Sequence, residues 1–229
     1  MSIEGVFFDL DGTLLDTAPD LATALNTLLG RKNRAQIDYQ HVRKVTSNGA
    51  NALLQLGFHC LPGDPGHSEL REELLACYLD TICVGTRPFA GIHSLLKRLG
   101  EHNIIWGIVT NKPWRYTDAL LRELDFPYAP ATVVCPDHVD NKKPAPDALW
   151  LACQEAGTTP STSIYIGDHL RDIECGINAG CKTIAVGYGY ISEPDDYLHW
   201  NADHCVAHAD EIWPLIAQYN QHPKGINTQ

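Results

Sequence analysis

The sequence predicts a doubly wound α/β fold, a parallel sheet covered by helices on both faces, with an all-helical insertion after the first strand. Three features of the chain lead to this prediction. Short apolar runs rich in β-branched residues recur, amphipathic helical patterns separate the later runs, and residues 16–86 contain helical patterns only. Near-continuous apolar strands that alternate with helices are typical of a parallel sheet buried on both faces.

Each expected strand is a short run of mostly apolar residues. In chain order the strands are expected at Gly5–Leu10, Ile104–Thr110, Thr132–Cys135, Ser163–Gly167, Thr183–Val186 and, more weakly, His204–Ala207. These runs are shorter than ordinary helices and are rich in β-branched residues, which favours strands.

The helices expected between the later strands carry apolar residues at helical spacing. They are Gly91–Leu99, Trp114–Leu124, Pro146–Ala156 and Leu170–Ala179. A helix with one apolar face packs that face against a sheet. Together with the strands, these helices are expected to form a Rossmann-like core from residues 1–15 and 87–229.

Residues 16–86 are expected to form a helical cap. Its helices are expected at Pro19–Leu29, His41–Leu56 and Ser68–Leu79, with joints at Gly30, Gly57 and Pro62–Gly66. A cap over the carboxyl ends of the strands would exclude water from a site there and add substrate contacts. At the far end of the chain, the polar stretch Asn220–Gln229 is expected to fray.

Composition limits the partners of this chain. Its 229 residues include 28 acidic and 17 basic ones, and the formal net charge of −11 disfavours binding to nucleic acid or to an anionic membrane. A small anionic substrate would need local positive charge. The eight cysteines are dispersed without C-x-x-C spacing, and no run is long enough to span a membrane. We expect a cytoplasmic protein with reduced thiols, monomeric or weakly dimeric.

Polar residues follow the expected strands at their carboxyl ends, where open α/β sheets bind ligands. Asp9 lies near the end of the first expected strand, and Asp11 follows that strand. Thr110 is the last residue of the second expected strand, and Asn111 follows it. Lys143 lies in the loop after the third strand, Asp168 follows the fourth, and Asp172 comes one helical turn later.

These residue types suit a magnesium ion and a phosphate. Asp9, Asp168 and the backbone carbonyl of Asp11 offer the oxygen ligands that Mg²⁺ prefers, and such an ion would offset the repulsion between close carboxylates. Asp172 is expected in a second shell, where it would orient Asp168 or a metal-bound water. The Thr110 hydroxyl, the backbone N–H of Asn111 and the Lys143 ammonium would hold phosphoryl oxygens.

Four motifs occur in order: "FDLDGT", "VTN", "KPAP" and "GDHLRD". With the helical insertion after the first, the chain resembles the haloacid dehalogenase superfamily, in its phosphatase branch with a helical cap. The resemblance implies that Asp9 is a nucleophile that forms an aspartyl-phosphate and that Asp11 is the general acid and base. It also implies a Mg²⁺ cofactor and a small phosphorylated metabolite as substrate, with Lys143 balancing charge.

Further segments narrow the resemblance. "WGIVTNKP", "CPDHV", "GDHLRDIECG" and "GYGYI" are similar to segments of the N-acetylmuramic acid 6-phosphate phosphatases, a group that implies a role in peptidoglycan recycling. Asn48, Lys112 and Arg115 are expected to bind the substrate, and the tyrosines of "GYGY" to line the same rim.

Other interpretations stay open at this point. The activity could be that of a phosphoglycolate phosphatase or a generalist sugar phosphatase, and a hexose-phosphate mutase, a dehalogenase and a non-catalytic binding protein are weaker alternatives. Asp172 could be an ordinary acid in the first turn of a helix. Gly49 could break a helix beside Asn48, and Arg115 could lie on a solvated helix face.

Overall fold

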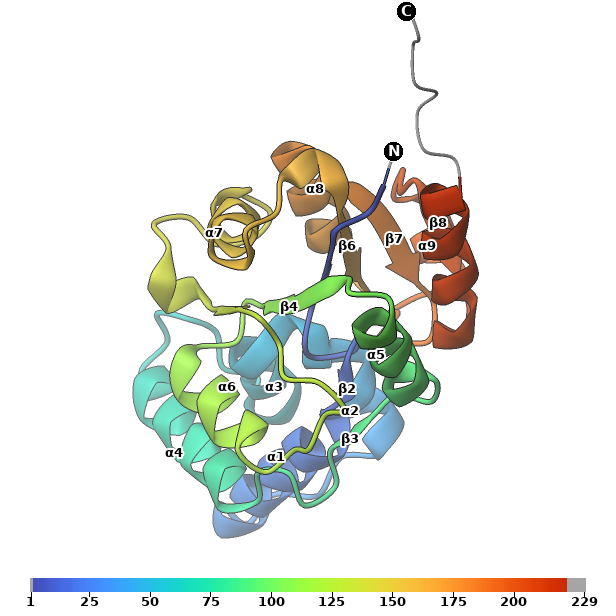
Figure 1. Ribbon diagram of the computed structural model, residues 1–229. Coiled ribbons are helices and arrows are strands. Elements are labelled where there is room, and N and C mark those ends of the chain that lie inside the picture. Colours follow the sequence, from blue (N-terminus) through green and yellow to red (C-terminus); the bar gives the residue numbers. More distant parts are fainter. Residues whose placement is uncertain (1, 222–229) are drawn as a thin grey trace, which may run out of the picture.

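A computed structural model describes residues 2–221 of the chain, and its centre is a six-stranded parallel sheet (Figure 1). The strand order is β5-β4-β1-β6-β7-β8, and every neighbouring pair is parallel. The strands are β1 (Gly5–Phe8), β4 (Ile105–Val109), β5 (Val133–Val134), β6 (Ser163–Gly167), β7 (Lys182–Val186) and β8 (His204–Val206). All six expected strands are present, which confirms the predicted fold class.

Helices bury both faces of this sheet because successive strand residues point to opposite sides. Val6 and Phe8 of β1 pack in one cluster with apolar residues of α5 (Ile92–Glu101) and α9 (Ile212–Gln221). Phe7 between them packs with residues of α7 (Asp147–Ala156) and α8 (Leu170–Ala179). A further helix, α6 (Trp114–Leu121), follows β4.

Helix α9 was not expected from the sequence. Pro214 lies in its first turn, where a missing amide proton breaks no intrahelical hydrogen bond. The end of α9 is tied to the start of the chain, because the Asn220 Oδ1 accepts a hydrogen bond of 2.6 Å from the Ile3 amide. The expectation of fraying is therefore wrong for Asn220 and Gln221, and residues 222–229 lie outside the described part of the chain.

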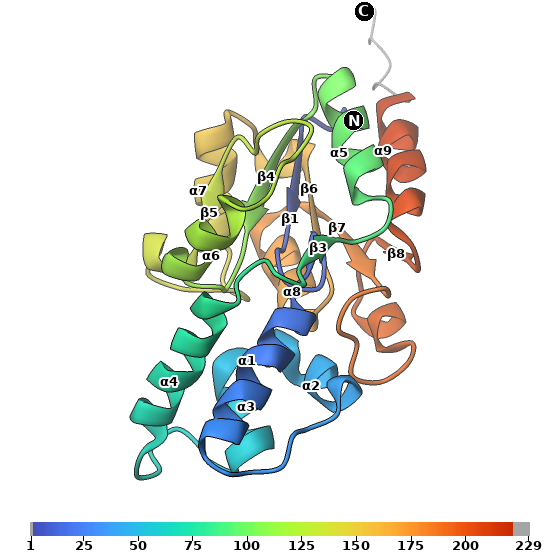
Figure 2. The ribbon, with the colours of Figure 1, turned by 90° about the horizontal axis from the view of Figure 1, so that it is seen from below.

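Four helices gather at one end of the sheet, as Figure 2 shows. They are α1 (Ala18–Arg31), α2 (Tyr39–Val45), α3 (Gly49–Phe58) and α4 (His67–Asp80). They share an apolar cluster of their own, which includes Leu25, Leu54 and Leu74. An antiparallel ribbon of β2 (Leu15–Asp16) and β3 (Arg87–Pro88) lies where this helical segment leaves and rejoins the rest of the chain.

The single helix expected over His41–Leu56 is in fact two. A 3-10 turn at Thr46–Asn48 separates α2 from α3, and Gly49 has a φ of +73°. A residue with a side chain rarely adopts this conformation, so the chain turns here rather than continuing one helix. Within residues 2–221, no helix has both the length and the apolar character needed to cross a membrane.

Candidate active site

Three carboxylates meet at the carboxyl ends of the central strands. Asp9 follows β1, Asp168 follows β6, and Asp172 lies in the first turn of α8; each offers an oxygen within 4.8 Å of the other two. Asp168 and Asp172 are buried, whereas the Asp9 side chain is 14% exposed. The structure thus brings together residues that are more than 150 positions apart in the sequence.

Lys143 places one ammonium group inside this cluster. Its Nζ lies 2.8 Å from Asp9 Oδ1 and 2.7 Å from Asp172 Oδ1, and it donates hydrogen bonds to the carbonyl of Val109 and the hydroxyl of Tyr165. Burial alone would lower the pKa of Lys143, but Asp172 and Asp9 raise it above its usual value. Lys143 therefore stays protonated.

The Asn111 side chain holds the backbone of Lys143. Its Nδ2 donates to the Lys143 carbonyl, and its Oδ1 accepts from the Lys143 amide, each at 3.2 Å. The sequence had suggested only the backbone N–H of Asn111 as a functional group. The side chain adds a structural task, because it fixes the loop that carries the ammonium.

The two oxygens of Asp9 have different surroundings. Oδ1 accepts a hydrogen bond of 2.7 Å from the Leu10 amide and pairs with Lys143, whereas Oδ2 has no hydrogen-bond partner among residues 2–221. Burial raises the pKa of Asp9 to about 6, against the opposing effect of Lys143. Burial, with repulsion from Asp9 and Asp172, raises the pKa of Asp168 to about 8.

The cluster fits a divalent cation. It holds three carboxylates against one ammonium, and a hard cation would stabilise their charged forms. Asp9 and Asp168 offer oxygen donors of the kind that Mg²⁺ takes, and the main-chain carbonyl of Asp11 is the third donor expected from the sequence. The backbone closes on Asp168 at Gly12, where an added Cβ would lie 2.1 Å from Asp168 Oδ2.

Asp172 has different partners from those expected. Its Oδ1 pairs with Lys143, and its Oδ2 accepts from the His169 amide at 3.1 Å. Among the described residues it makes no hydrogen bond to Asp168. The hydrogen bonds on Asp168 come instead from the Thr13 hydroxyl, at 3.2 Å, the Ser47 hydroxyl, at 3.4 Å, and the Tyr190 amide, at 2.8 Å. One of the two rim tyrosines therefore reaches this site.

Asp11 lies beside the cluster with a second lysine. Its Oδ1 accepts from the Thr17 hydroxyl at 2.5 Å and lies 3.0 Å from Lys112 Nζ. The Lys112 ammonium also lies over the ring of Tyr78, 4.7 Å from its centroid. Burial would lower the pKa of Lys112, but Asp11 and Tyr78 raise it above its usual value. Thr110 is buried next to this pair, and its Oγ1 accepts from the Lys112 amide at 3.1 Å.

A cavity of about 320 Å³ opens from Asp11 toward the helical segment. Its wall includes Asn48, Asn111 and Lys112, as the sequence suggested, and Asn48 also accepts a 3.5 Å contact from Arg171. The described residues that line it are Asp11, Leu21, Thr46, Asn48, Gly49, Ala50, Asn51, Leu53, Arg71, Leu74, Leu75, Tyr78, Asn111, Lys112, Pro113, Tyr116, Pro136 and Lys142.

Arg115 is not part of this wall, so its expected contact with the substrate is not supported. It is exposed on α6, lies 5.9 Å from the Tyr116 ring and faces a neighbouring hollow of about 360 Å³. Arg71, which the sequence analysis did not single out, lines both spaces. The sequence did contain a signal for Arg71, because its spacing from Leu74, Leu75 and Tyr78 places all four on one helix face.

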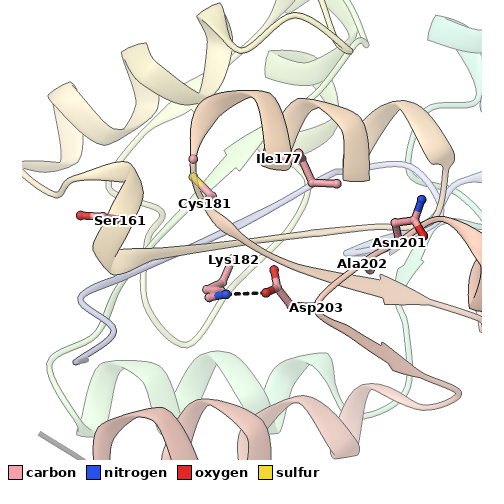
Figure 3. A pocket seen from close by; sticks show the side chains of 8 residues that line it. Ser161, Ile177, Cys181, Lys182, Asn201, Ala202 and Asp203 are labelled. Atoms are coloured by element: carbon pink, nitrogen blue, oxygen red, sulfur yellow. Dashed lines mark hydrogen bonds and ion pairs between the residues drawn. The ribbon is translucent and has the colours of Figure 1, made fainter. Parts of the chain in front are cut away.

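A separate hollow of about 610 Å³ lies at the amino end of β7 (Figure 3). Lys182 is the one cation among the described residues that line it, and it forms an ion pair with Asp203. Because ligands in such sheets bind at the opposite ends of the strands, this hollow is not the candidate active site.

Comparisons with known proteins identify one family and relatives along nearly the whole chain. The family model described as haloacid dehalogenase-like hydrolase matches residues 6–186. The chain is 42% identical to the N-acetylmuramic acid 6-phosphate phosphatase of Pseudomonas aeruginosa, over 94% of this chain and 96% of that protein. It is 34% identical to a phosphoglycolate phosphatase of Xanthomonas campestris pv. campestris, over 93% and 96%.

Solved structures share the fold. A predicted phosphoglycolate phosphatase from Haemophilus somnus superimposes with a TM-score of 0.82 at 23% identity, covering 94% of this chain and 98% of that one. A haloacid dehalogenase-like hydrolase from Bacteroides fragilis gives 0.79 at 19% identity, with 92% and 100% covered.

Proposed function

We propose that this chain, which belongs to the haloacid dehalogenase-like hydrolases and is a phosphatase, removes the phosphate from N-acetylmuramic acid 6-phosphate. The proposed substrate rests on sequence similarity. Along nearly its whole length the chain is more similar to proteins named for that activity than to the phosphoglycolate phosphatases.

The cavity supports an anionic substrate. Arg71, Lys112 and Lys142 line it, and Asp11 is the one carboxylate among its described lining residues. This local excess of positive charge lies within a chain of net charge −11. Leucines and aromatic rings in the same wall offer apolar contact to a sugar and its methyl groups.

We propose that Asp9 attacks phosphorus with Oδ2, the oxygen that carries no hydrogen bond, while the Leu10 amide and Lys143 hold Oδ1. A bond forms between Asp9 and phosphorus, and the bond from phosphorus to the sugar oxygen breaks. Asp11 gives its proton to the departing sugar oxygen and then takes a proton from the water that hydrolyses the aspartyl-phosphate. Phosphate leaves and both carboxyl groups return to their first state.

The other residues stabilise charge in this scheme. Thr110 Oγ1 accepts a hydrogen bond from the Lys112 amide, so its own hydroxyl proton remains available for a phosphoryl oxygen. The Asn111 N–H and the Lys143 ammonium bind the other phosphoryl oxygens. Asp9, Asp168 and the Asp11 carbonyl would hold Mg²⁺, which would supply positive charge for the phosphoryl group. Asp172 keeps Lys143 oriented and charged.

We propose residues 16–86 as a cap, and a cytoplasmic role in peptidoglycan recycling. The cap proposal is supported by the separate apolar cluster of α1–α4 and by the place of that segment at the carboxyl ends of the strands. All eight cysteines are free thiols, which fits a reducing compartment.

The test is kcat/KM for N-acetylmuramic acid 6-phosphate, N-acetylglucosamine 6-phosphate, glucose 6-phosphate and phosphoglycolate, each with Mg²⁺. We expect the first to be preferred, because a site built to bond particular polar groups rejects analogues that leave its own atoms unpaired. A preference for phosphoglycolate, or no advantage over glucose 6-phosphate, would leave only the phosphatase class.

A further inference from the structure

The inner face of α4 forms one wall of the cavity. Arg71, Leu74, Leu75 and Tyr78 line it, and their spacing of three, four and seven residues places them on one side of the helix. Tyr78 lies at the catalytic end, because its ring contacts the Lys112 ammonium that pairs with Asp11. Arg71 lies two turns away, about 10 Å along the helix axis.

Within the described part of the chain, Arg71 has no recorded partner that neutralises its charge. Among residues 2–221, the structure records no hydrogen bond, ion pair or ring contact for its guanidinium, whereas Lys112 is paired with Asp11 and Lys143 with Asp9 and Asp172. Asp11, the one carboxylate among the described lining residues, already has its lysine. Arg71 therefore offers an unused charge about two helical turns from Tyr78, the residue of this wall that contacts Lys112.

Lys142 is the other cation of the wall without a recorded ion pair among the described residues. It directly precedes Lys143, whose ammonium contacts Asp9, and so belongs to the core side of the cavity. Arg71 stands on the helical segment instead, with Leu74 and Leu75 between it and Tyr78. The wall therefore runs from a charged catalytic end, over an apolar stretch, to a guanidinium.

We infer that Arg71 binds a carboxylate that the substrate carries across its sugar ring from the phosphate, and that this contact sets the preference for an acidic sugar phosphate. The inference rests on the proposed function. A guanidinium suits this task because it donates two parallel hydrogen bonds to a carboxylate and stays charged at any working pH. The lactyl group of N-acetylmuramic acid 6-phosphate, on C3, carries such a carboxylate, and N-acetylglucosamine 6-phosphate lacks it.

The test replaces Arg71 by Gln and measures kcat and KM on three substrates with Mg²⁺. For N-acetylmuramic acid 6-phosphate, kcat/KM should fall roughly 10- to 100-fold, mainly through KM, the scale of one charged hydrogen-bonded contact. N-acetylglucosamine 6-phosphate should be hydrolysed as by the wild type. Phosphoglycolate should also be unaffected, because its carboxylate lies too near its phosphate to reach Arg71.

Three further variants complete the test, and the first two are matched controls. Arg115→Gln removes the same charge from an exposed position that lines only the neighbouring hollow, and it should leave all three substrates unchanged. Lys142→Gln removes the other unpaired cation of the cavity and should not change the ratio between the two sugar phosphates. Arg71→Lys keeps the charge without the planar fork and should restore only part of the preference.

The outcomes separate this inference from the proposed function. A wild-type enzyme with no preference for N-acetylmuramic over N-acetylglucosamine 6-phosphate contradicts the proposed substrate, and the inference with it. A wild-type preference that survives in Arg71→Gln, or that Lys142→Gln removes instead, overturns only the inference. An equal loss on all three substrates would mean that Arg71 supports the structure, and it too overturns the inference.

Discussion

At the scale of single residues, the chemistry depends on how neighbours divide the oxygens of Asp9. The Leu10 amide and Lys143 both contact Oδ1, and we propose that Oδ2 attacks phosphorus. Asp9→Asn keeps the size of the side chain but removes its nucleophilic charge, so kcat should fall by at least about 10⁴-fold. Thermal unfolding of the variant should remain cooperative, and beryllofluoride should bind covalently to wild type alone. Substantial turnover by the Asn variant would contradict the role of Asp9.

Asp11 is a residue whose contribution should depend on the leaving group. Its removal in Asp11→Asn should lower kcat on a sugar phosphate by roughly 10²- to 10⁴-fold, the range of general acid–base catalysis. The loss should be smaller for p-nitrophenyl phosphate in the phosphorylation step, because p-nitrophenolate leaves without a proton. Equal losses on both substrates, with phosphorylation shown to limit the rate, would count against the acid role.

At the scale of elements, the loop after β1 must pass very close to the loop after β6. Gly12 has a φ of +88°, and an added Cβ would lie 2.1 Å from Asp168 Oδ2. The strained backbone alone should make Gly12→Ala lower the free energy of unfolding by about 1–3 kcal/mol. The variant should also displace Asp168 and so raise the Mg²⁺ concentration needed for activity.

Gly63 provides the matched control for this prediction. Its φ is +98°, but nothing lies within 4 Å of its added Cβ. Gly63→Ala should lower the free energy of unfolding through the same backbone strain, without changing the Mg²⁺ concentration needed for activity. If the two variants had the same Mg²⁺ requirement, the close approach of Gly12 to Asp168 would have no bearing on the metal site.

At the scale of the whole molecule, buried negative charge is concentrated at one place. The cluster of Asp9, Asp168 and Asp172 has Lys143 as its one recorded ion-pair partner among residues 2–221. Treatment with EDTA should abolish phosphatase activity, and Mg²⁺ should restore it. Ca²⁺ should inhibit, since its looser and higher coordination would let Asp9 bind through both oxygens and lose its attacking position. Full activity in chelator would exclude the proposed metal site.

The same cluster should make the stability of the metal-free protein depend on pH. The pKa values of Asp9 and Asp168, about 6 and about 8, lie above the ordinary carboxyl value of 3.8. Between pH 4 and pH 8 the folded state therefore holds more protons than the unfolded state, and the free energy of unfolding should fall as pH rises. Above pH 8 this loss should be complete.

Mg²⁺ should reverse this loss, because it binds the deprotonated carboxylates. The rise in melting temperature on adding Mg²⁺ should thus be larger at pH 8 than at pH 5, as measured by calorimetry. In Asp168→Asn, the rise in melting temperature caused by Mg²⁺ should differ less between pH 8 and pH 5. A Mg²⁺ effect that is independent of pH would mean that these carboxyl groups do not bind the ion.

Local signals in the sequence predicted the sheet, its flanking helices and the rim that carries Asp9, Asp168 and Lys143. Apolar runs and helical periodicity are local signals, and the parallel topology brings the carboxyl ends of β1, β4 and β6 to one edge. These local signals did not indicate α9, whose first turn contains a proline, and they left the break at Gly49 between α2 and α3 as an alternative to one continuous helix.

Which charged side chains pair with one another could not be predicted from the sequence, because the pairs form across the packed fold. Lys143 is paired with both Asp9 and Asp172, and Lys112 with Asp11, although 134 and 101 positions separate Lys143 from Asp9 and Lys112 from Asp11. The tertiary structure also placed Arg71, and not Arg115, in the wall of the cavity. Such pairings depend on how helices from distant segments pack. The spacing of residues along one helix shows which of them share a face, but it does not show which distant segment that face meets.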